Sequence, residues 1–196
     1  MDILLDVDGV LRNIVDVLIR IYRRELDPTT TITHKDIKMF DVRPAMPLVE
    51  DPKQFFFIDH AAEVFGTALP YPGVIAAINE MYEDHDIHIV TNQFPGNESI
   101  TLNWLWNWEI PYHSISFIKD KTRLSDAGDV LLDDKLKTLL DFRVVKGAIP
   151  VCHSQPWNSE WDGLRVGSLQ EFNELLRWKH VLTAYKDYPV VTHQTL

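Results

Sequence analysis

The sequence has few of the features that mark secreted, disulfide-rich or membrane-spanning proteins. Its 196 residues include a single cysteine, Cys152, which cannot form a disulfide within the chain. A chain with one thiol is typical of a reducing compartment, and we expect the cytoplasm. No apolar run approaches the roughly 18 residues of a membrane-spanning helix, and the first residues lack the basic and apolar regions of a signal peptide. We therefore expect no membrane partner.

Positive charge is also scarce. The chain has 19 Lys and Arg against 29 Asp and Glu, so its formal net charge at pH 7 is -10. This charge disfavours a nucleic-acid polymer as partner, because the phosphates would be repelled overall. A small anionic substrate remains compatible, since a metal ion and a few lysines can reverse the field locally. The sequence leaves open whether the chain forms a homodimer.

Short apolar segments alternate with amphipathic ones along most of the chain. The apolar runs predict strands at 3–5, 86–91, 114–118, 129–134, 148–152 and 164–166. The helical spacing predicts helices at 13–25, 72–83, 98–109, from 135 onward, and to about 179 after a Ser168 cap. Strands that alternate with helices imply right-handed crossovers, so we predict an α/β fold with a doubly wound, Rossmann-like parallel sheet.

Residues 27–70 interrupt this alternation. They contain a threonine cluster, the aromatic run Phe55-Phe56-Phe57 and several prolines, namely Pro28, Pro44, Pro47, Pro52 and Pro70. The segment is too aromatic to stay disordered, so we interpret it as an insert over one end of the sheet. The expected organisation is a core domain of residues 1–26 and 71–180, a small insert of residues 27–70, and a C-terminal tail of residues 181–196.

Polar residues follow several of the predicted strands, at the edge where open α/β sheets bind ligands. Asp6 and Asp8 follow the first strand, Thr91 ends the second, and Asp133 and Asp134 end the fourth. Two carboxylates one residue apart repel each other, so a cation or a chemical role is expected there. Each signal alone has an ordinary explanation, such as a surface pair, a turn or a helix cap. Their occurrence together at strand ends predicts a single site.

The predicted site has the parts needed for phosphoryl transfer. Carboxylates from two strands can hold Mg²⁺, and a carboxylate can also attack phosphorus to form an aspartyl phosphate. The Thr91 hydroxyl and the ammonium of Lys121, in the loop after the third strand, would bind phosphate oxygens. Gly9 would let the backbone approach the phosphate closely. Lys119 and Lys135 are nearby alternatives to Lys121.

The segments DVDGVL, IVTNQ, the Lys121 loop and VLLDDK, in that order, resemble the four motifs of the haloacid dehalogenase (HAD) superfamily of phosphohydrolases. The resemblance spans residues 2–178 and implies a HAD-like fold, in which the insert of residues 27–70 is a small helical cap placed after the first strand and helix. It implies that Asp6 is the nucleophile and that Asp8 is the general acid and then the general base. It also implies a Mg²⁺ site made by Asp6, the main-chain carbonyl of Asp8, Asp133 and Asp134. The phosphate ligands that it implies are Gly9, Thr91, Asn92 and Lys121.

Within that superfamily the chain is similar to the 5′(3′)-deoxyribonucleotidases and their bacterial and phage relatives. The segments that carry this similarity are FFFIDHAAEVFGTALPYPGVIAAINEM, DKT at 120–122, DVLLDDK, and VCHSQPWN followed by WDGLRVGSLQEF. It implies a Mg²⁺-dependent phosphatase acting on nucleoside monophosphates, deoxyribonucleotides above all. Aromatic cap residues of that family stack on the base, and the candidates are Phe40, Phe55, Phe56 and Phe57. The alternative for the three consecutive phenylalanines is the internal core of the cap.

Two other functions remain open on the sequence. One is a HAD phosphatase for a sugar phosphate or another small phosphate ester, because a fold permits many substrates. The other is a non-catalytic nucleotide-binding protein. The remaining conspicuous residues have structural interpretations: His153 and Cys152 as buried residues, Trp157 and Trp161 as loop packing with a smaller chance of lining the site, and Trp104, Trp106 and Trp108 as helix packing.

Overall fold

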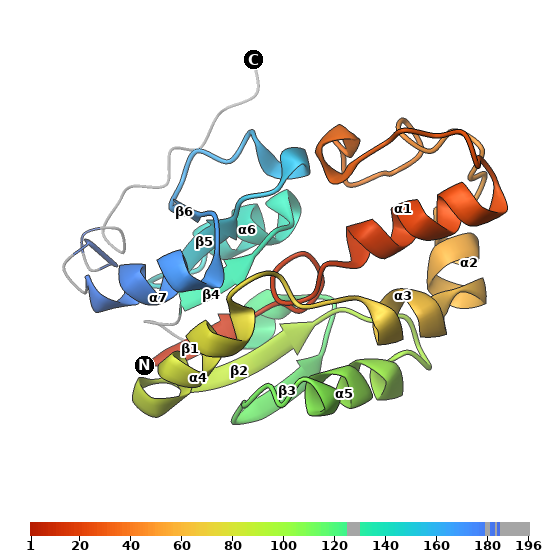
Figure 1. Cartoon of the computed structure of the whole chain (residues 1–196). Coiled ribbons are helices and arrows are strands. Elements are labelled where there is room, and N and C mark those ends of the chain that lie inside the picture. The colour runs from red at the N-terminus through yellow and green to blue at the C-terminus, as the bar shows by residue number, and fades with distance from the viewer. Residues whose placement is uncertain (125–129, 179–180, 183, 185–196) are drawn as a thin grey trace, which may run out of the picture.

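The computed structural model describes residues 1–124, 130–178, 181–182 and 184 (Figure 1). Its centre is a six-stranded sheet in the order β3-β2-β1-β4-β5-β6, and all neighbouring strands are parallel. The strands are β1 (Asp2–Leu5), β2 (Asp86–Thr91), β3 (Ser114–Phe117), β4 (Val130–Asp133), β5 (Ile149–His153) and β6 (Arg165–Val166). The predicted α/β class and the doubly wound parallel sheet are confirmed.

Seven α-helices and four shorter turns connect or flank these strands in the described part of the chain. The α-helices are α1 (Ile14–Glu25), α2 (Pro52–Gln54), α3 (Ala61–Thr67), α4 (Val74–Asp84), α5 (Glu98–Asn107), α6 (Leu136–Arg143) and α7 (Leu169–Arg177). The short turns are η1 (His34–Asp36), the π-helix η2 (Phe55–Asp59), η3 (Lys121–Leu124) and η4 (Pro156–Asn158). No helix in the described residues combines the length and the apolar character needed to span a membrane.

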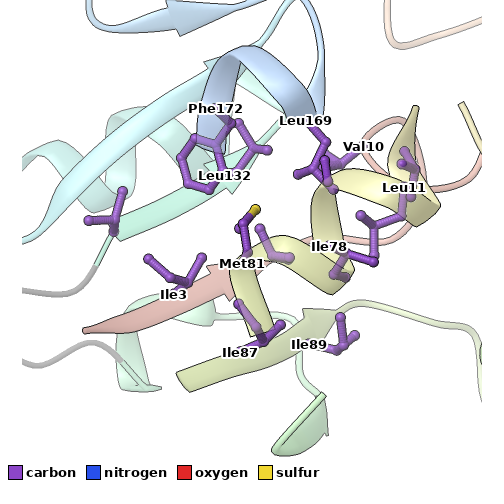
Figure 2. Packing of buried hydrophobic residues seen from close by; sticks show 14 of the residues in the cluster. Ile3, Val10, Leu11, Ile78, Met81, Ile87, Ile89, Leu132, Leu169 and Phe172 are labelled. Atoms are coloured by element: carbon purple, nitrogen blue, oxygen red, sulfur yellow. The ribbon is translucent and has the colours of Figure 1, made fainter. Parts of the chain in front are cut away.

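Alternate side chains of each strand pack on opposite faces of the sheet, as the two-residue period of a strand requires. Ile3 and Leu5 of β1 belong to the largest hydrophobic cluster, which also holds side chains of α4, α5 and α7. Figure 2 shows Met81 of α4 and Phe172 of α7 packed over this face. Leu4 points the other way and packs in a smaller cluster that includes Phe142 of α6. The sheet is therefore buried on both faces.

A second hydrophobic cluster lies beyond the carboxyl ends of the strands, where Figure 1 shows α1, α2 and α3. Its fully buried members come from α1 and from residues 37–68, and Phe56 is completely inaccessible to solvent. The apolar face of α1 thus packs on the insert. The domain boundary drawn at residue 26 stays a prediction.

The ends of most elements lie close to those predicted, because capping residues mark them. Asn13 caps α1 by accepting a hydrogen bond from the Asp16 amide, and Ser168 caps α7 by accepting one from Glu171. The predicted strand start at Asp129 and helix end at Lys179 lie outside the described residues. Of the predicted tail, Leu182 packs in the largest hydrophobic cluster.

The tryptophans of α5 differ from the prediction that all three pack against the protein. Trp104 is buried and donates its indole N–H to the carbonyl of Ala68 at 2.6 Å. Trp106 is 82% exposed, so the prediction is wrong for this residue, because side chains two apart on a helix point to different sides. Trp108 follows the last residue of α5 and is 36% exposed.

This contrast provides a matched test of the fold. Trp104→Ala should lower the free energy of unfolding by roughly 3–5 kcal/mol, because it leaves a large cavity beneath α5. Trp106→Ala removes the same side chain from an exposed position and should change it by less than about 0.5 kcal/mol. Equilibrium unfolding in urea measures both values. Equal losses from the two substitutions would contradict the assigned packing of α5.

Candidate active site

Three carboxylates gather where β1 and β4 end side by side. The register pairs Leu5 with Leu132, so Asp6 and Asp133 leave adjacent strands at the same level. One carboxylate oxygen from each of Asp6, Asp133 and Asp134 lies within 4.8 Å of the others. A cavity of about 310 Å³ opens onto this cluster, and among its lining residues are Asp6, Asp8, Thr91, Lys121 and Asp134. The structure therefore brings together residues predicted from four separate parts of the sequence.

Lys121 lies between two of these carboxylates. Its Nζ is 2.9 Å from Oδ1 of Asp6 and 2.6 Å from Oδ2 of Asp133, and the side chain is buried. Burial alone would lower the pKa of Lys121, but the negative charges of Asp133 and Asp6 outweigh it and raise that pKa above its usual range. Lys121 is thus a permanent cation in the site.

The charged forms of these carboxylates remain disfavoured despite Lys121. Burial, opposed by Lys121 and reinforced by Asp133, raises the pKa of Asp6 to about 6. Burial and the charge of Asp133 raise the pKa of Asp134 well above its ordinary value. Removing carboxylates from water and placing them together disfavours their charged forms. One ammonium therefore does not neutralise the cluster.

The donor set fits a hard divalent cation. Carboxylate oxygens from the partly buried Asp6 and the buried Asp133 and Asp134 lie close enough to enter one coordination shell, and oxygen is the donor that Mg²⁺ prefers. A cation held there would offset the burial and the mutual repulsion that raise the pKa of Asp6 and Asp134. The residues present are therefore consistent with the predicted Mg²⁺ site.

Gly9 has a steric reason to be glycine. Its φ is +81°, a left-handed conformation that favours glycine, and a Cβ built on it would lie 2.3 Å from Oδ2 of Asp134. The same Asp134 oxygen accepts a hydrogen bond from the indole of Trp157 at 2.9 Å. The Gly9 carbonyl accepts a hydrogen bond from Gln155 at 2.8 Å and lies 2.7 Å from Nδ1 of His153. The backbone after Asp8 is thus fixed from the β5 side of the sheet.

Asp8 has partners that the sequence did not suggest. Oδ1 of Asp8 lies 2.7 Å from Nε of Arg12, whose side chain is fully buried, and Oδ2 accepts a hydrogen bond from Gln93 at 2.8 Å. Arg12 follows Asp8 by four residues but lies outside any helix, so helical spacing gives no signal for this pair. Gln93 is the last residue of the segment IVTNQ, which by itself indicates no contact with Asp8.

The phosphate-binding candidates lie around the same cavity. Thr91 is buried at the end of β2, and its hydroxyl is 3.4 Å from Nε2 of Gln93. Asn92 follows it and is exposed on the cavity wall. Of the two alternatives to Lys121, Lys119 is exposed, and the ammonium of Lys135 lies 4.7 Å from the centre of the Phe40 ring. Neither ammonium forms an ion pair with the carboxylate cluster in the described structure, although the main-chain amide of Lys135 donates to Oδ1 of Asp133 at 2.8 Å.

The four aromatic candidates of the cap separate into two pairs. Phe40 and Phe57 line the cavity, whereas Phe55 and Phe56 are not among the lining residues. Phe56 is fully buried in the cluster shared with α1, and Phe55 packs against that cluster, as the alternative interpretation expected. Consecutive side chains of the helical run 55–59 point in different directions, so one of three neighbours faces the cavity and another the interior. Phe57 also stacks on Phe94 at 5.7 Å between ring centres.

Two buried residues of β5 and two tryptophans of the following loop lie near the site. Cys152 is buried on β5, and burial raises the pKa of its thiol to about 12, so it is an unreactive core residue. His153 is buried as well, and desolvation lowers its pKa. Trp161 packs with Cys152 in a small cluster. Trp157 lines the cavity, which was the less favoured of the two interpretations of that residue.

Comparison with known proteins assigns the chain to a family. Residues 1–182 match the model of the family described as 5′ nucleotidase, deoxy (Pyrimidine), cytosolic type C protein. The chain belongs to this 5′-nucleotidase family. The resemblance to HAD-superfamily deoxyribonucleotidases is thereby confirmed, and the family is one of phosphoric monoester hydrolases.

One curated relative from Chlorobaculum tepidum carries the name "Putative 5′(3′)-deoxyribonucleotidase". It is 27% identical over 77 residues, which represent 39% of this chain and 37% of that protein. The match therefore spans little more than a third of the relative's length.

Solved structures share the fold of this 5′-nucleotidase family member at low identity. A haloacid dehalogenase-like family hydrolase from Streptococcus pneumoniae superposes with a TM-score of 0.62 and 14% identity, over 89% of this chain and 97% of that one. The L-2-haloacid dehalogenase from Xanthobacter autotrophicus does so with a TM-score of 0.60 and 10% identity, over 90% and 98% of the two chains. Both establish the HAD-like fold alone.

The steric role of Gly9 generates a prediction with a built-in control. Gly9→Ala should push Asp134 out of place and weaken Mg²⁺ binding about 10-fold or more, as loss of groups that orient metal ligands commonly does. Gly73→Ala is the control, because Gly73 has nearly the same φ of +82° and nothing within 4 Å of the added Cβ. It should cost only about 1–2 kcal/mol of stability. Calorimetric Mg²⁺ titration and urea unfolding measure the two effects, and equal Mg²⁺ affinity in both variants would refute the assignment.

Proposed function

We propose that this protein is a Mg²⁺-dependent phosphatase that hydrolyses nucleoside monophosphates, with deoxyribonucleotides favoured, through an aspartyl-phosphate intermediate. The observation that carries the proposal is the convergence of Asp6, Asp133 and Asp134 around Lys121 at one cavity. Membership of the 5′-nucleotidase family supports the reaction class. The family description also supports the cytoplasmic location expected from the single cysteine.

In the proposed mechanism Asp6 is the nucleophile. Its Oδ1 accepts a hydrogen bond from the Val7 amide and pairs with Lys121, so the carboxylate is fixed in orientation. Oδ2 forms no hydrogen bond or ion pair with the described residues that would compete with attack on phosphorus. Attack forms the bond from Asp6 to phosphorus and breaks the ester bond, and Asp8 gives its proton to the leaving oxygen.

The second half of the reaction reverses the role of Asp8. Asp8 accepts a proton from water as the water oxygen bonds to phosphorus, and the bond between phosphorus and Asp6 breaks. The Thr91 hydroxyl and Lys121 ammonium neutralise the charge on the phosphoryl oxygens. A Mg²⁺ ion held by Asp6, Asp133, Asp134 and the Asp8 carbonyl would supply further electrostatic stabilisation of that charge.

The opposite wall of the cavity supports a substrate with an apolar, flat part. Side chains of α1 and the insert form this wall, including Val15, Leu18, Phe57 and Phe65, and Phe94 adds a further ring. Aromatic rings stack favourably on a nucleobase, and a hydrocarbon wall tolerates a sugar without the 2′-hydroxyl. The proposed organisation, with residues 27–70 as the cap that meets the base, follows from this wall.

The assigned nucleophile predicts the outcome of one substitution. Asp6→Asn should reduce phosphate release by at least about three orders of magnitude, since the amide cannot form the covalent intermediate. Asp141→Asn is the matched control, because Asp141 pairs with Lys137 on the exposed side of α6. A malachite-green assay of inorganic phosphate measures both. Full turnover by Asp6→Asn would remove the nucleophile from the mechanism.

A substrate panel decides the substrate class and the metal. Deoxyribonucleoside monophosphates should be hydrolysed with kcat/KM at least about tenfold above ribose 5-phosphate, which corresponds to roughly 1.4 kcal/mol in the transition state. Chelation of divalent metal should abolish activity, and added Mg²⁺ should restore it. A tenfold preference for the sugar phosphate would favour the alternative phosphatase, and nucleotide binding without turnover would favour a non-catalytic protein.

A further inference from the structure

Both carboxylate oxygens of Asp8 are held by side chains to which the proposed function assigns no role. On one side, Nε of Arg12 lies 2.7 Å from Oδ1, and on the other, Nε2 of Gln93 donates to Oδ2 at 2.8 Å. A carboxylate that has one hydrogen-bond partner can rotate about its terminal torsion. Hydrogen bonds to both of its oxygens prevent this rotation. Asp8 is therefore fixed in direction as well as in position.

The first of these two partners, Arg12, is itself held rigidly. Its side chain is completely buried, Nη1 donates to the Phe65 carbonyl at 2.8 Å, and Nη2 donates to Oγ1 of Thr101 at 3.1 Å. The guanidinium carbon lies 5.0 Å from the Phe65 ring centre and 5.1 Å from that of Trp104, which are cation–π distances. Every part of the group is engaged, so its Nε–H direction toward Asp8 is set by the fold.

Gln93 is the second partner of Asp8, and it also contacts Thr91. Its Nε2 lies 3.4 Å from Oγ1 of Thr91 as well as 2.8 Å from Asp8, so one amide group spans two proposed site residues. Its Oε1 is buried without a hydrogen-bond partner among the residues that the structure describes. A buried acceptor without a donor costs free energy, so Oε1 does not explain the position of the Gln93 side chain. The contacts of its Nε2 with Asp8 and Thr91 explain that position.

We propose that Gln93 and Arg12 are positioning residues that hold Asp8 in the orientation from which it accepts the proton of the attacking water. This inference rests on the proposed function, in which that water cleaves the bond between Asp6 and phosphorus. An ionised carboxylate has about four acceptor positions, and the two side chains occupy two of them. The remaining lone pairs on Asp8 are left for the water proton, and the Thr91 hydroxyl, accepting from Gln93, keeps its own proton for the phosphoryl group.

The two chemical steps differ in how much they need Asp8, and a substrate with a good leaving group separates them. With p-nitrophenyl phosphate the departing nitrophenolate needs no proton, so formation of the phosphoenzyme is insensitive to Asp8. Hydrolysis of the phosphoenzyme still requires proton transfer from water to Asp8. Loss of the positioning contact should therefore slow only the second step.

The experiment is stopped-flow release of nitrophenolate by the Gln93→Met variant, with Mg²⁺ present. We expect a burst of about one nitrophenolate per enzyme, at a rate within about threefold of the wild type. We expect a steady-state rate about 10–100-fold below that of the wild type, which is a part of the roughly 10²–10⁴-fold that a general base contributes, because Asp8 itself is retained. Acid-quenched samples should contain phosphorylated protein that is absent from Asp6→Asn.

Two further variants separate positioning from folding. Gln93→Glu keeps the volume of the side chain but places a carboxylate against Asp8, so it should show the same burst and slow phase. Gln170→Met makes the same substitution on α7, away from the cavity, and should behave as the wild type. Thermal unfolding of each variant is measured beside the kinetics, and a slow phase without a lowered melting temperature supports positioning.

The outcomes distinguish this inference from the proposed function. If burst and steady-state rates fall together in both Gln93 variants, or if neither falls while Asp6→Asn is inactive, the positioning role is wrong and the phosphatase stands. If the wild type releases no phosphate from nitrophenyl phosphate or from nucleotides with Mg²⁺ present, the proposed function is wrong and this inference falls with it.

Discussion

The free-energy cost of gathering three carboxylates, two of them buried and Asp6 partly buried, is the constraint on which the rest of the site depends. It arises from the sheet order, because β1 and β4 are neighbours in parallel register, so Asp6, just after β1, and Asp133, at the end of β4, come to one point. Lys121 relieves part of it, yet the pKa of Asp6 still rises to about 6. Burying like charges is unfavourable for folding, so the hydrophobic clusters on both faces of the sheet must offset it. A site of this kind is maintained for what it binds.

The carboxylates at the strand ends are oriented by side chains that also contact the surrounding loops and the insert. Trp157 holds Asp134 through its indole N–H, and its ring stacks on His34 of the insert at 5.6 Å. Arg12 holds Asp8 and also the last turn of α3 through the Phe65 carbonyl. The Asn97 amide donates to the carbonyl of Phe57 at 2.8 Å. The insert is therefore attached to the same residues that orient the acidic groups, and its position and theirs are set together.

The sequence predicted the features that depend on local pattern and missed those that depend on tertiary contact. Strands, caps and the acidic motif residues were predictable, because apolar runs and strand-terminal polar residues are visible in a single segment. Trp106 was misassigned because three tryptophans in one helix cannot share a face. Arg12 and Gln93 gave no signal, since Asp8 lies across a turn from Arg12 and Gln93 reaches it from the loop after a different strand. For Phe55, Phe56 and Phe57, the family resemblance implied an aromatic cap, but only the helical turn 55–59 decides which ring meets the cavity.

The packing of α1 separates the apolar wall of the cavity from the charged end of the sheet. This helix follows the Asp6 loop, but its apolar face contributes to the cluster with Ile37, Met46 and Phe56 of the insert. Asp133 and Lys121 pair with each other at the end of the sheet, whereas much of the opposite cavity wall packs in that separate cluster. A substitution in the second cluster would reshape the wall without moving Asp133 or Lys121. Neither residue is a member of that cluster, so substitutions in the cluster should add nearly independently to substitutions at Asp133 or Lys121.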